Sequence, residues 1–218
     1  PELTRALVDL YRTGTPEPSG HMDQKDGRTI LVHDAETKRR TDAPIPPGPL
    51  REALRARVAT RIVPKIRRAF MIEITRVERF IVAAYDAADR GFFKMHRDNT
   101  TSGTAHRRFA VTINLNAEDH DGGELVFPEF GGRRYKAPTG GAIVFSCALL
   151  HQAEPVTRGI RYATLPFLYD ESAVALRVAG NAALGPGVPP YDPASADDRL
   201  FARAGARSAG PRLMPCMR

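Results

Sequence analysis

Between residues 72 and 170 the sequence has the pattern of many short β-strands separated by glycine-rich turns. In residues 109–116 apolar side chains alternate with alanine, threonine and asparagine, the two-residue period of a strand with one buried face. Asp121-Gly122-Gly123 and Thr139-Gly140-Gly141 supply turns. The predicted strands are Ile72–Tyr85, Phe92–Asp98, Arg107–Leu115, Glu124–Phe127, Arg133–Ala137, Ala142–Cys147, His151–Val156 and Ile160–Tyr169. Many short strands with tight turns favour a mainly β fold, a β-sandwich or jelly roll.

The segment before these strands has the strongest helical pattern in the chain. Apolar residues recur there every four positions: Leu50, Leu54, Val58, Ile62, Ile66 and Phe70. This repeat predicts a helix over about residues 49–70 whose apolar stripe packs on the sheet. Pro64 should kink the helix or end it early. The basic side chains on its other faces are expected to be solvated.

The N-terminal segments have weaker patterns. Residues 2–12 have weak helical periodicity, and Arg28–His33 has the pattern of a strand. Residues 38–49 are too rich in proline and charge for regular structure. We therefore expect a helical and irregular supporting region over residues 1–71 and a β-rich core over residues 72–171.

The last part of the chain, residues 172–218, is expected to lie outside that core. Ser172–Ala179 could form a short helix, and residues 185–193 have the composition of a linker. The last 25 residues are small, polar and rich in arginine, which predicts a mobile tail.

Composition excludes several classes of protein. A chain of 218 residues with 42% hydrophobic residues can bury a core. Its strongly apolar runs, such as Phe80–Tyr85, are far shorter than the roughly 20 residues of a membrane helix, and no secretory leader is evident. Pro1 fits either removal of an initiator Met or a segment of a longer chain. Because Cys147 and Cys216 cannot form a disulfide framework, we expect a reducing cytoplasm.

The net charge of +7 comes mainly from arginine. Solubility is the simplest explanation of this charge, and a nucleic acid or an acidic partner is the alternative. Guanidinium groups also suit planar anions such as carboxylates and phosphates.

Two His-x-Asp pairs are candidates for metal ligation, because alternation puts both side chains on one face of a strand. His21-Met22-Asp23 lies among turn formers where no strand is predicted, so we interpret it as a loop without a site. His96-Arg97-Asp98 ends a predicted strand. With the later His151 it offers two imidazoles and one carboxylate. Such a set occupies three facial positions of an octahedral metal and leaves three open, which suits Fe(II) with a chelating co-substrate and O₂.

Arg161 follows His151 by ten residues, across a turn-forming segment. We expect the two residues on adjacent antiparallel strands. A guanidinium there could hold the far carboxylate of a dicarboxylate whose other end binds the metal. A surface salt bridge is the alternative for Arg161 taken alone.

From about Phe80 to Tyr169 the chain resembles the prolyl 4-hydroxylase-like branch of the 2-oxoglutarate/Fe(II) dioxygenases, and especially bacterial relatives of the oxygen-sensing prolyl hydroxylases. An ordered set of motifs carries the resemblance: Ile81-Val82-Ala83-Ala84-Tyr85, His96-Arg97-Asp98-Asn99, Asn114-Leu115-Asn116, Asp121-Gly122-Gly123-Glu124-Leu125, His151 and Thr157-Arg158-Gly159-Ile160-Arg161-Tyr162-Ala163. The resemblance implies a double-stranded β-helix, a jelly-roll or cupin-like fold, with supporting helices.

The resemblance also implies roles for single residues. The implied iron ligands are His96, Asp98 and His151. Arg161 matches the basic residue that holds the distal carboxylate of 2-oxoglutarate, and Tyr85 matches a tyrosine near that co-substrate. Asn114 stands where many relatives carry a tyrosine that binds the same carboxylate. The second contact to the carboxylate therefore stays open, with Thr112 and Tyr85 as further candidates.

The implied activity is hydroxylation of an unactivated C–H bond, with 2-oxoglutarate and O₂ as co-substrates and succinate and CO₂ as co-products; ascorbate would support it. Because Asp98 is present, halogenation is not expected, while desaturation and ring formation remain open. A prolyl or other amino-acid or peptide-type substrate is expected. The predicted substrate contacts are Arg97, Asn99 and Thr100, and residues 38–47 could cover the entrance as a lid.

Two other functions remain as alternatives. Nucleic-acid oxidative demethylases share the ligand set, but they usually carry two arginines six apart after the last ligand, whereas Arg158 and Arg161 are three apart. They also need a base-flipping segment rich in aromatic residues, which is not evident. A non-enzymatic cupin-like binding module would use His96 and His151 as buried structural residues.

The remaining candidates are single residues. His106 flanks a basic loop and could contact substrate, His120 is expected at the surface, and His21 and His33 are interpreted as structural. Cys147 lies in an apolar strand and is expected to be inert. The sequence does not indicate the oligomeric state.

Overall fold

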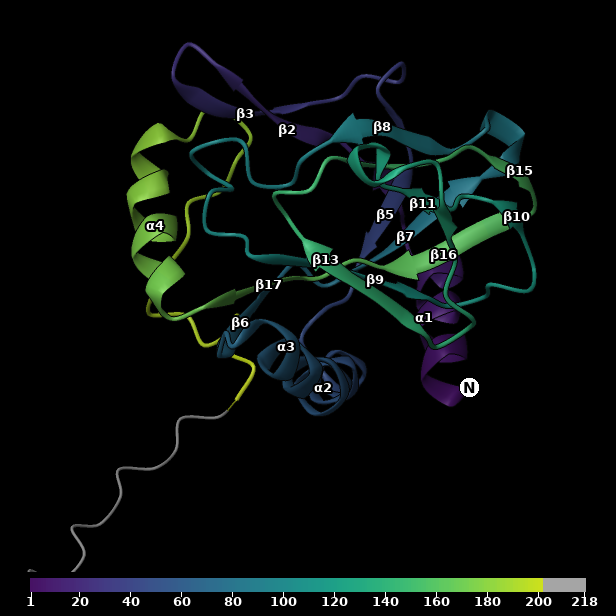
Figure 1. Ribbon diagram of the computed structural model, residues 1–218, viewed down its shortest axis with the longest axis horizontal. Coiled ribbons are helices and arrows are strands. Elements are labelled where there is room, and N and C mark those ends of the chain that lie inside the picture. The colour runs from purple at the N-terminus through teal and green to yellow at the C-terminus, as the bar shows by residue number, and fades with distance from the viewer. Residues whose placement is uncertain (202–218) are drawn as a thin grey trace, which may run out of the picture.

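The computed structural model describes residues 1–201, which form a mainly β molecule with helices on its outside (Figure 1). The helices are α1 (Glu2–Thr13), α2 (Pro49–Arg57), α3 (Val63–Phe70) and α4 (Ser172–Gly180), with a π-helical segment at Val58–Ile62 and short 3-10 turns at Ala87–Asp89, Pro128–Phe130 and Asn181–Ala183. Within residues 1–201, no helix has both the length and the apolar character needed to cross a membrane.

The larger sheet is antiparallel, with strand order β1-β5-β7-β16-β9-β17-β6 and with β13 paired to β9. Its strands are β1 (Glu17–Pro18), β5 (Thr41–Pro44), β6 (Ile74–Glu78), β7 (Ile81–Asp86), β9 (Phe109–Asn114), β13 (Ala142–Ser146), β16 (Ile160–Thr164) and β17 (Phe167–Asp170). One edge of β9 pairs with β13, and the other is shared by β16 and β17.

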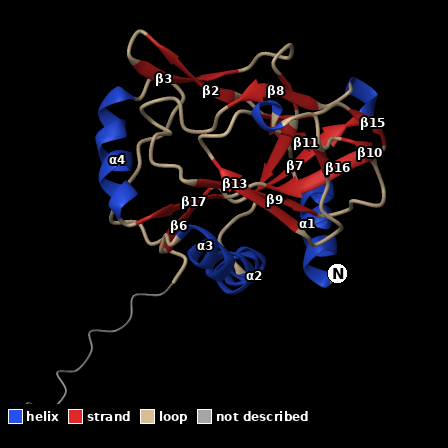
Figure 2. Cartoon of the chain, viewed as in Figure 1, coloured by secondary structure: helices blue, strands red, loops and turns tan. Residues whose placement is uncertain are grey.

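The smaller sheet has the order β12-β11-β14-β8-β4 and lies across from the larger one (Figure 2). Its strands are β4 (Lys38–Arg39), β8 (Phe92–His96), β11 (Leu125–Val126), β12 (Arg134–Tyr135) and β14 (His151–Ala153). Two further pairs are β2 (His21–Lys25) with β3 (Arg28–Val32), and β10 (Asp121–Gly122) with β15 (Val156–Arg158). The curled antiparallel sheets confirm the predicted double-stranded β-helix.

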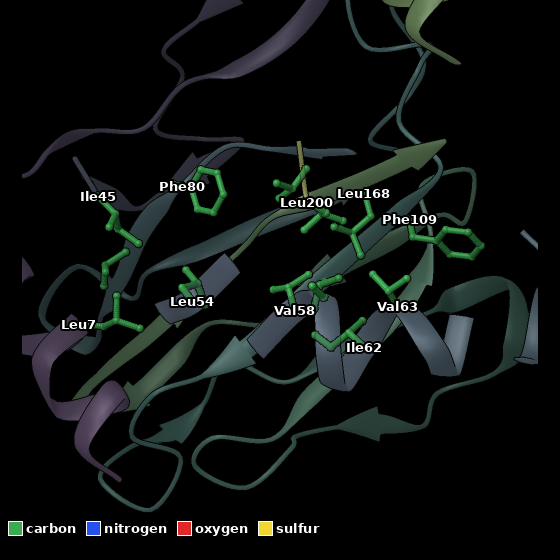
Figure 3. Close-up of a cluster of buried hydrophobic side chains, with 14 of the residues drawn as sticks. Leu7, Ile45, Leu54, Val58, Ile62, Val63, Phe80, Phe109, Leu168 and Leu200 are labelled. Carbon is green, nitrogen blue, oxygen red and sulfur yellow. The ribbon is translucent and has the colours of Figure 1, made fainter. Parts of the chain in front are cut away.

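Strand alternation sorts the side chains of the larger sheet into two layers. One set packs with α1, α2 and α3 in the main hydrophobic core (Figure 3) and includes Val82, Ala84, Phe109, Val111 and Tyr162. The intervening set turns toward the smaller sheet and includes Ala83, Tyr85, Ala110, Thr112 and Arg161. The helices therefore cover one face of the larger sheet and leave the other free to line a cavity.

The four-residue repeat of the long helix is accommodated by a change of helix type. In a regular α-helix, residues four apart are rotated by about 40° from one another, so a repeat from Leu54 to Phe70 would wind off the sheet. The π-helical segment absorbs this drift, because the Val63 N–H bonds to the Val58 carbonyl five residues earlier. Pro64 lacks an N–H and follows this turn directly. The predicted early end is wrong, since helical structure continues to Phe70.

Two predicted strands are each divided into two. The run Ile72–Tyr85 is interrupted at Arg79, whose φ of 69° turns the chain between β6 and β7. The run Ile160–Tyr169 is interrupted at Pro166, which has no N–H for a sheet hydrogen bond. Both breaks let the chain change its neighbouring strand within the larger sheet.

The prediction of irregular structure over residues 38–49 is wrong, because β4 and β5 lie there. Lys38 and Arg40 are buried, so the charges that argued against a strand have partners inside the protein. The interpretation of His21–Asp23 as a loop is also wrong, since these residues form part of β2. In both segments tertiary pairing outweighs local composition.

The prediction that the last 25 residues are mobile is wrong for those that the structure describes. Leu200 is buried in the main core, and its N–H bonds to the Thr75 carbonyl on β6. Asp198 is 7% exposed and pairs with Arg76 of β6. This segment therefore covers the free edge of β6. The remaining part of the predicted tail, residues 202–218, lies outside the described residues.

Candidate metal centre

The three predicted metal ligands come from two neighbouring strands of the smaller sheet. His151 of β14 and His96 of β8 are direct partners in the strand register. Asp98 follows β8 by two residues, and its N–H bonds to the Cys147 carbonyl at 3.0 Å. Alternation therefore turns the carboxylate to the same side as His96, and pairing with β14 brings His151 beside both.

The ligand atoms are close enough to share one ion. The Nε2 atoms of His96 and His151 each lie 3.5 Å from a carboxylate oxygen of Asp98. One nitrogen from each imidazole and one carboxylate oxygen all fall within 4.8 Å of one another, the only such group of His, Cys, Asp and Glu in residues 1–201.

Each candidate histidine is oriented by the carbonyl two residues before it in the chain. His96 Nδ1 lies 2.8 Å from the Lys94 carbonyl oxygen, and His151 Nδ1 lies 3.0 Å from that of Leu149. A carbonyl only accepts, so each Nδ1 carries the proton and each Nε2 presents its lone pair to the cluster. This is the tautomer that metal binding requires.

Burial and charge set the protonation states of His151 and Asp98. Burial lowers the pKa of His151 to about 4, although the Asp98 charge opposes this shift. Burial alone would raise the pKa of Asp98, but its contacts with His96 and His151 and the Arg107 charge hold that pKa well below its ordinary value. At neutral pH His151 is therefore a neutral imidazole and Asp98 is a carboxylate.

The cluster lies in a small cavity between the two sheets, with a volume of about 60 Å³. The lining comprises polar and charged groups, namely Arg40, Arg79, Tyr85, His96, Asp98, Thr112, His151 and Arg161, and apolar groups that include Phe93, Ala110, Val111, Leu125, Phe145, Ala153, Leu165 and Phe167.

Arg161 faces the cluster from the opposite sheet. The prediction that it lies on a strand adjacent to His151 is wrong, because β16 pairs with β7 and β9 of the larger sheet. Arg161 is 3% exposed, and its Nη2 donates to Thr112 Oγ1 at 2.9 Å. Its guanidinium carbon lies 5.1 Å from the ring centre of Tyr85. No carboxylate of residues 1–201 forms a salt bridge with it, so a buried cation faces the cavity without an anion.

The glycine turn Asp121-Gly122-Gly123 makes room for Arg161. Gly123 has a φ of 73°, and a Cβ built there would lie 2.8 Å from Arg161 Cδ. A Cβ on Gly122 would lie 2.3 Å from the Pro155 carbonyl oxygen. Any larger residue would therefore displace β15 or the guanidinium, which is the physical reason for this motif.

Asn114 and the predicted substrate contacts lie at the edge of this arrangement. Asn114 is buried, its Oδ1 is 3.5 Å from Arg161 Nη2, and its amide donates to the Ala137 carbonyl. Arg97 points away from the cavity and pairs with Glu129 at 2.6 Å. The next two residues, Asn99 and Thr100, are half-buried and exposed in the following turn and do not line the cavity.

Two arginines that line the cavity, Arg40 and Arg79, were not predicted as site residues. Arg40 precedes β5, and its Nη1 donates to the Tyr85 hydroxyl at 3.3 Å while its Nη2 pairs with Asp42 at 2.7 Å. Arg79 occupies the break between β6 and β7. The alternation of Lys38, Arg40 and Asp42 was a usable signal for a strand with a charged inner face.

Other histidine predictions need correction. His106 is buried, and its Nε2 is 2.5 Å from Glu78 Oε2, so it does not face the substrate side of the cavity. His120 is buried rather than at the surface. Burial, followed by the Lys136 charge, lowers the pKa of His120 to about 4. Cys147 is a buried thiol whose pKa is raised well above its ordinary value by burial, as expected for inert core.

The residues present fit Fe(II) and a bound dicarboxylate. Two imidazoles and one carboxylate are the donor set of non-haem Fe(II) sites with open positions. The same cavity holds the buried guanidinium of Arg161, which a carboxylate would neutralise. The arrangement can therefore hold a metal at one end of a short diacid and a cation at the other.

Comparisons with known proteins agree with this chemistry. The family model of the 2OG-Fe(II) oxygenase superfamily matches residues 80–169. The PKHD-type hydroxylase of Synechococcus sp. (strain JA-2-3B'a(2-13)) is 34% identical over 98 residues, which cover 42% of this chain and 43% of that protein. The PKHD-type hydroxylase PiuC of Pseudomonas aeruginosa is 36% identical over 92 residues, covering 38% and 40%. The chain thus spans less than half the length of these curated relatives.

Among solved structures, a prolyl hydroxylase from Trichoplax adhaerens, in complex with a hypoxia inducible factor oxygen degradation domain peptide fragment, has a TM-score of 0.56 and 20% identity over 80% of each chain. At that identity the likeness shows the fold alone. The matched segment carries the three candidate ligands and Arg161, and the matching family is named for Fe(II) and 2-oxoglutarate. Residues 80–169 of this chain thus match the 2OG-Fe(II) oxygenase superfamily and are similar to PKHD-type hydroxylases.

Proposed function

We propose that this chain hydroxylates an unactivated C–H bond of a prolyl or other amino-acid or peptide-type substrate, using Fe(II), 2-oxoglutarate and O₂. The observation that carries the proposal is the convergence of His96, Asp98 and His151 in one cavity with Arg161. Succinate and CO₂ would be the co-products.

In this proposal the smaller sheet holds the metal. His96 and His151 would bind Fe(II) through Nε2, because both Nδ1 atoms are committed to backbone carbonyls. Asp98 would supply the single carboxylate. Bound Fe(II) supplies activation of O₂ coupled to oxidative decarboxylation of 2-oxoglutarate, and the protein supplies orientation and exclusion of water.

The larger sheet would hold the co-substrate. Arg161 would bind the distal carboxylate of 2-oxoglutarate through its planar fork of N–H donors. Thr112, which accepts from Arg161, fixes the guanidinium and has its own hydroxyl proton available for the same carboxylate. Tyr85 lies under the guanidinium, and Asn114 would support the site from behind through its weak contact to Arg161.

The substrate is proposed to enter near Arg97, Asn99 and Thr100, which follow the metal-binding strand. The nucleic-acid demethylase alternative is less well supported. Arg158, the second arginine after the last ligand, is exposed and pairs with Asp121 at 2.6 Å, so it is not available to the cavity. The peptide bound to the Trichoplax prolyl hydroxylase makes a peptide substrate a reasonable first choice.

Purified protein supplied with Fe(II), ascorbate and 2-oxoglutarate tests the proposal. Succinate release should rise when pools of proline-containing peptides are added, and the product should gain one oxygen atom by mass spectrometry. The His96→Ala variant should lose metal binding and succinate release, whereas the exposed-site control His33→Ala should keep both. Metal binding that survives His96→Ala would contradict the ligand assignment.

We also propose a cytoplasmic location. The support is Cys147, a free and buried thiol in the described part of the chain, which is compatible with a reducing compartment. Fractionation of cells that express the chain, with blotting of each fraction, checks this location.

A further inference from the structure

One cation of the cavity has no anionic partner, even when the metal and the co-substrate are bound. Three guanidinium groups line it, those of Arg40, Arg79 and Arg161. Arg40 is neutralised by Asp42 at 2.7 Å. Arg161 is assigned to 2-oxoglutarate in the function proposed above. Arg79 forms no salt bridge with any carboxylate of residues 1–201.

The fold holds Arg79 in place. Its Nε and Nη2 donate to the Leu165 carbonyl oxygen at 3.2 and 2.9 Å, and its guanidinium carbon lies 4.4 Å from the ring centre of Phe167. Its Nη1 has no hydrogen-bond partner within the described chain. The residue also has a φ of 69°, which costs a non-glycine residue about 1 kcal/mol or more. Arg79 is thus held by stacking on Phe167 and by the Leu165 carbonyl, and its Nη1 donors are left to bind a ligand.

The charged neighbours of Arg79 are already committed. Arg107 lies over the same Phe167 ring at 4.0 Å but is paired with Glu78 at 2.6 Å. Lys38 also lacks a carboxylate, but it lies outside the cavity lining and its Nζ donates to the Gly20 carbonyl. Burial, followed by the Arg40 charge, lowers the pKa of Arg79 to about 10, so the guanidinium is still charged at neutral pH.

The charges of the loaded cavity leave Arg79 unbalanced. The two charges of Fe(II) and that of Arg161 are balanced by Asp98 and the two carboxylates of 2-oxoglutarate. Arg79 is half-buried, and a partly desolvated cation without a carboxylate is stabilised where a ligand supplies the anion. The missing anion must come from the remaining component of the reaction, which is the substrate.

We propose that Arg79 binds a carboxylate of the substrate, so that the preferred substrate is an acid. The carboxylate could be the α-carboxylate of a free amino acid or C-terminal residue, or the side chain of an aspartyl or glutamyl residue. The inference rests on the proposed function. The Phe167 ring beneath the guanidinium would fix the plane of the fork and hence the orientation of the acid.

Binding to the wild-type protein tests the proposal without a variant. The protein is loaded with Mn(II) and 2-oxoglutarate under argon, and three acid–amide pairs are titrated: L-proline and L-prolinamide, L-aspartate and L-asparagine, L-glutamate and L-glutamine. At least one acid should bind at least about tenfold more tightly than its amide, the value of one charge-assisted pair. The pair that shows the preference separates an α-carboxylate from a side-chain source. If every amide binds as well as its acid, or if no compound binds, the proposal is wrong.

Sodium acetate serves as the minimal probe of the anion site. In the same loaded protein, acetate should raise the unfolding temperature above that in sodium chloride of equal ionic strength. Arg79→Gln should lose this difference, and the exposed control Arg61→Gln should keep it. Arg79→Lys keeps the charge without the fork and should keep part of it.

The rival explanation is that Arg79 only caps the Leu165 carbonyl beside Pro166. In that case Arg79→Gln and Arg79→Lys would both lower the unfolding temperature of the unloaded protein. The difference in unfolding temperature between acetate and chloride would also persist in both variants. This result would overturn the proposal. Under the proposal, removal of an unpaired charge leaves the unloaded Arg79→Gln protein at least as stable as wild type.

The two proposals fail differently. Absence of Mn(II) and 2-oxoglutarate binding to the wild-type protein would refute the function proposed above. Normal binding of both, together with equal binding of acids and amides, would refute only the role of Arg79.

Discussion

At the scale of single residues, the metal-binding geometry is set by very local contacts. Each candidate ligand histidine is oriented by the carbonyl two residues before it, Lys94 for His96 and Leu149 for His151. No second carboxylate is needed to fix either tautomer. The ligand orientation therefore follows once β8 and the bend that leads into β14 have formed.

Replacement of Arg161 by Gln should weaken 2-oxoglutarate binding by about 10- to 100-fold, because a charge-assisted pair with a carboxylate contributes about 1.5–3 kcal/mol. Arg161→Lys should restore part of the affinity, since it returns the charge without the bidentate fork. Isothermal titration of 2-oxoglutarate into the Mn(II)-loaded protein measures both. Unchanged affinity in Arg161→Gln would remove this residue from the co-substrate site.

The unloaded protein should lose stability in acid. His151 and His120 are buried with pKa values lowered from 6.5 to about 4, mainly by burial. Below pH 6.5 the unfolded chain binds protons that the folded protein does not, so stability is complete above that pH and is lost as the pH falls toward 4. Each histidine accounts for up to about 3 kcal/mol over this window.

Thermal or urea unfolding between pH 7 and pH 4 measures that loss. His120→Leu removes one of the two groups without touching the metal ligands, so this variant should lose roughly half as much stability over the window. An equal loss of unfolding free energy between pH 7 and pH 4 in wild type and variant would show that His120 does not contribute to the acid sensitivity.

At the scale of elements, the long helix shows how sequence spacing and helix type are matched. Apolar residues at a strict four-residue spacing cannot stay on one face of an α-helix. The π turn over Val58–Ile62 restores them to the sheet, so that Leu54 before the turn and Ile66 after it are both about 2% exposed. Pro64 marks where the α-helical hydrogen bonding is interrupted.

Ile66→Ala should therefore destabilise the protein by about 2–5 kcal/mol, as large-to-small changes in a core do. The neighbouring Lys65 is exposed, and Lys65→Ala should change the free energy of unfolding by less than about 0.5 kcal/mol. Urea unfolding of both variants measures the difference. Similar changes in the free energy of unfolding for the two variants would mean that the apolar face of the helix no longer packs on the sheet after the π-helical segment.

At the scale of the whole molecule, the C-terminal segment closes the edge of the larger sheet. Asp198 accepts hydrogen bonds from Tyr169 at 2.5 Å and Tyr191 at 2.7 Å and pairs with Arg76 at 2.9 Å. Residues far from the metal cluster thus complete the sheet that carries Arg161.

Asp198→Ala should lower the free energy of unfolding by about 2–4 kcal/mol, because it removes one partner of a buried ion pair and leaves two tyrosine hydroxyls without an acceptor. Asp197, the adjacent and exposed carboxylate, contacts Arg51 only at 3.8 Å, so Asp197→Ala should change stability by less than about 0.5 kcal/mol. Chemical unfolding of both variants makes the comparison. Equal losses would show that the segment is not anchored through Asp198.

The strand pattern and the ligand set were predictable, since both depend on local order. Alternation in residues 109–116 and the two-residue spacing of His96 and Asp98 follow directly from the geometry of a strand. The breaks at Arg79 and Pro166 were harder to predict, because strand-forming residues continue on both sides of each.

The sequence by itself determined which groups could bind a metal, because a strand fixes the direction of neighbouring side chains. Only the tertiary structure decided what lies across from them. His151 and Arg161 are ten residues apart but belong to opposite sheets. Arg40 lines the same cavity from a segment whose composition suggested irregular structure. Arg79 lines it from a segment that was predicted as one unbroken strand. Pairing between distant strands depends on the packing of the whole molecule, which no local period encodes.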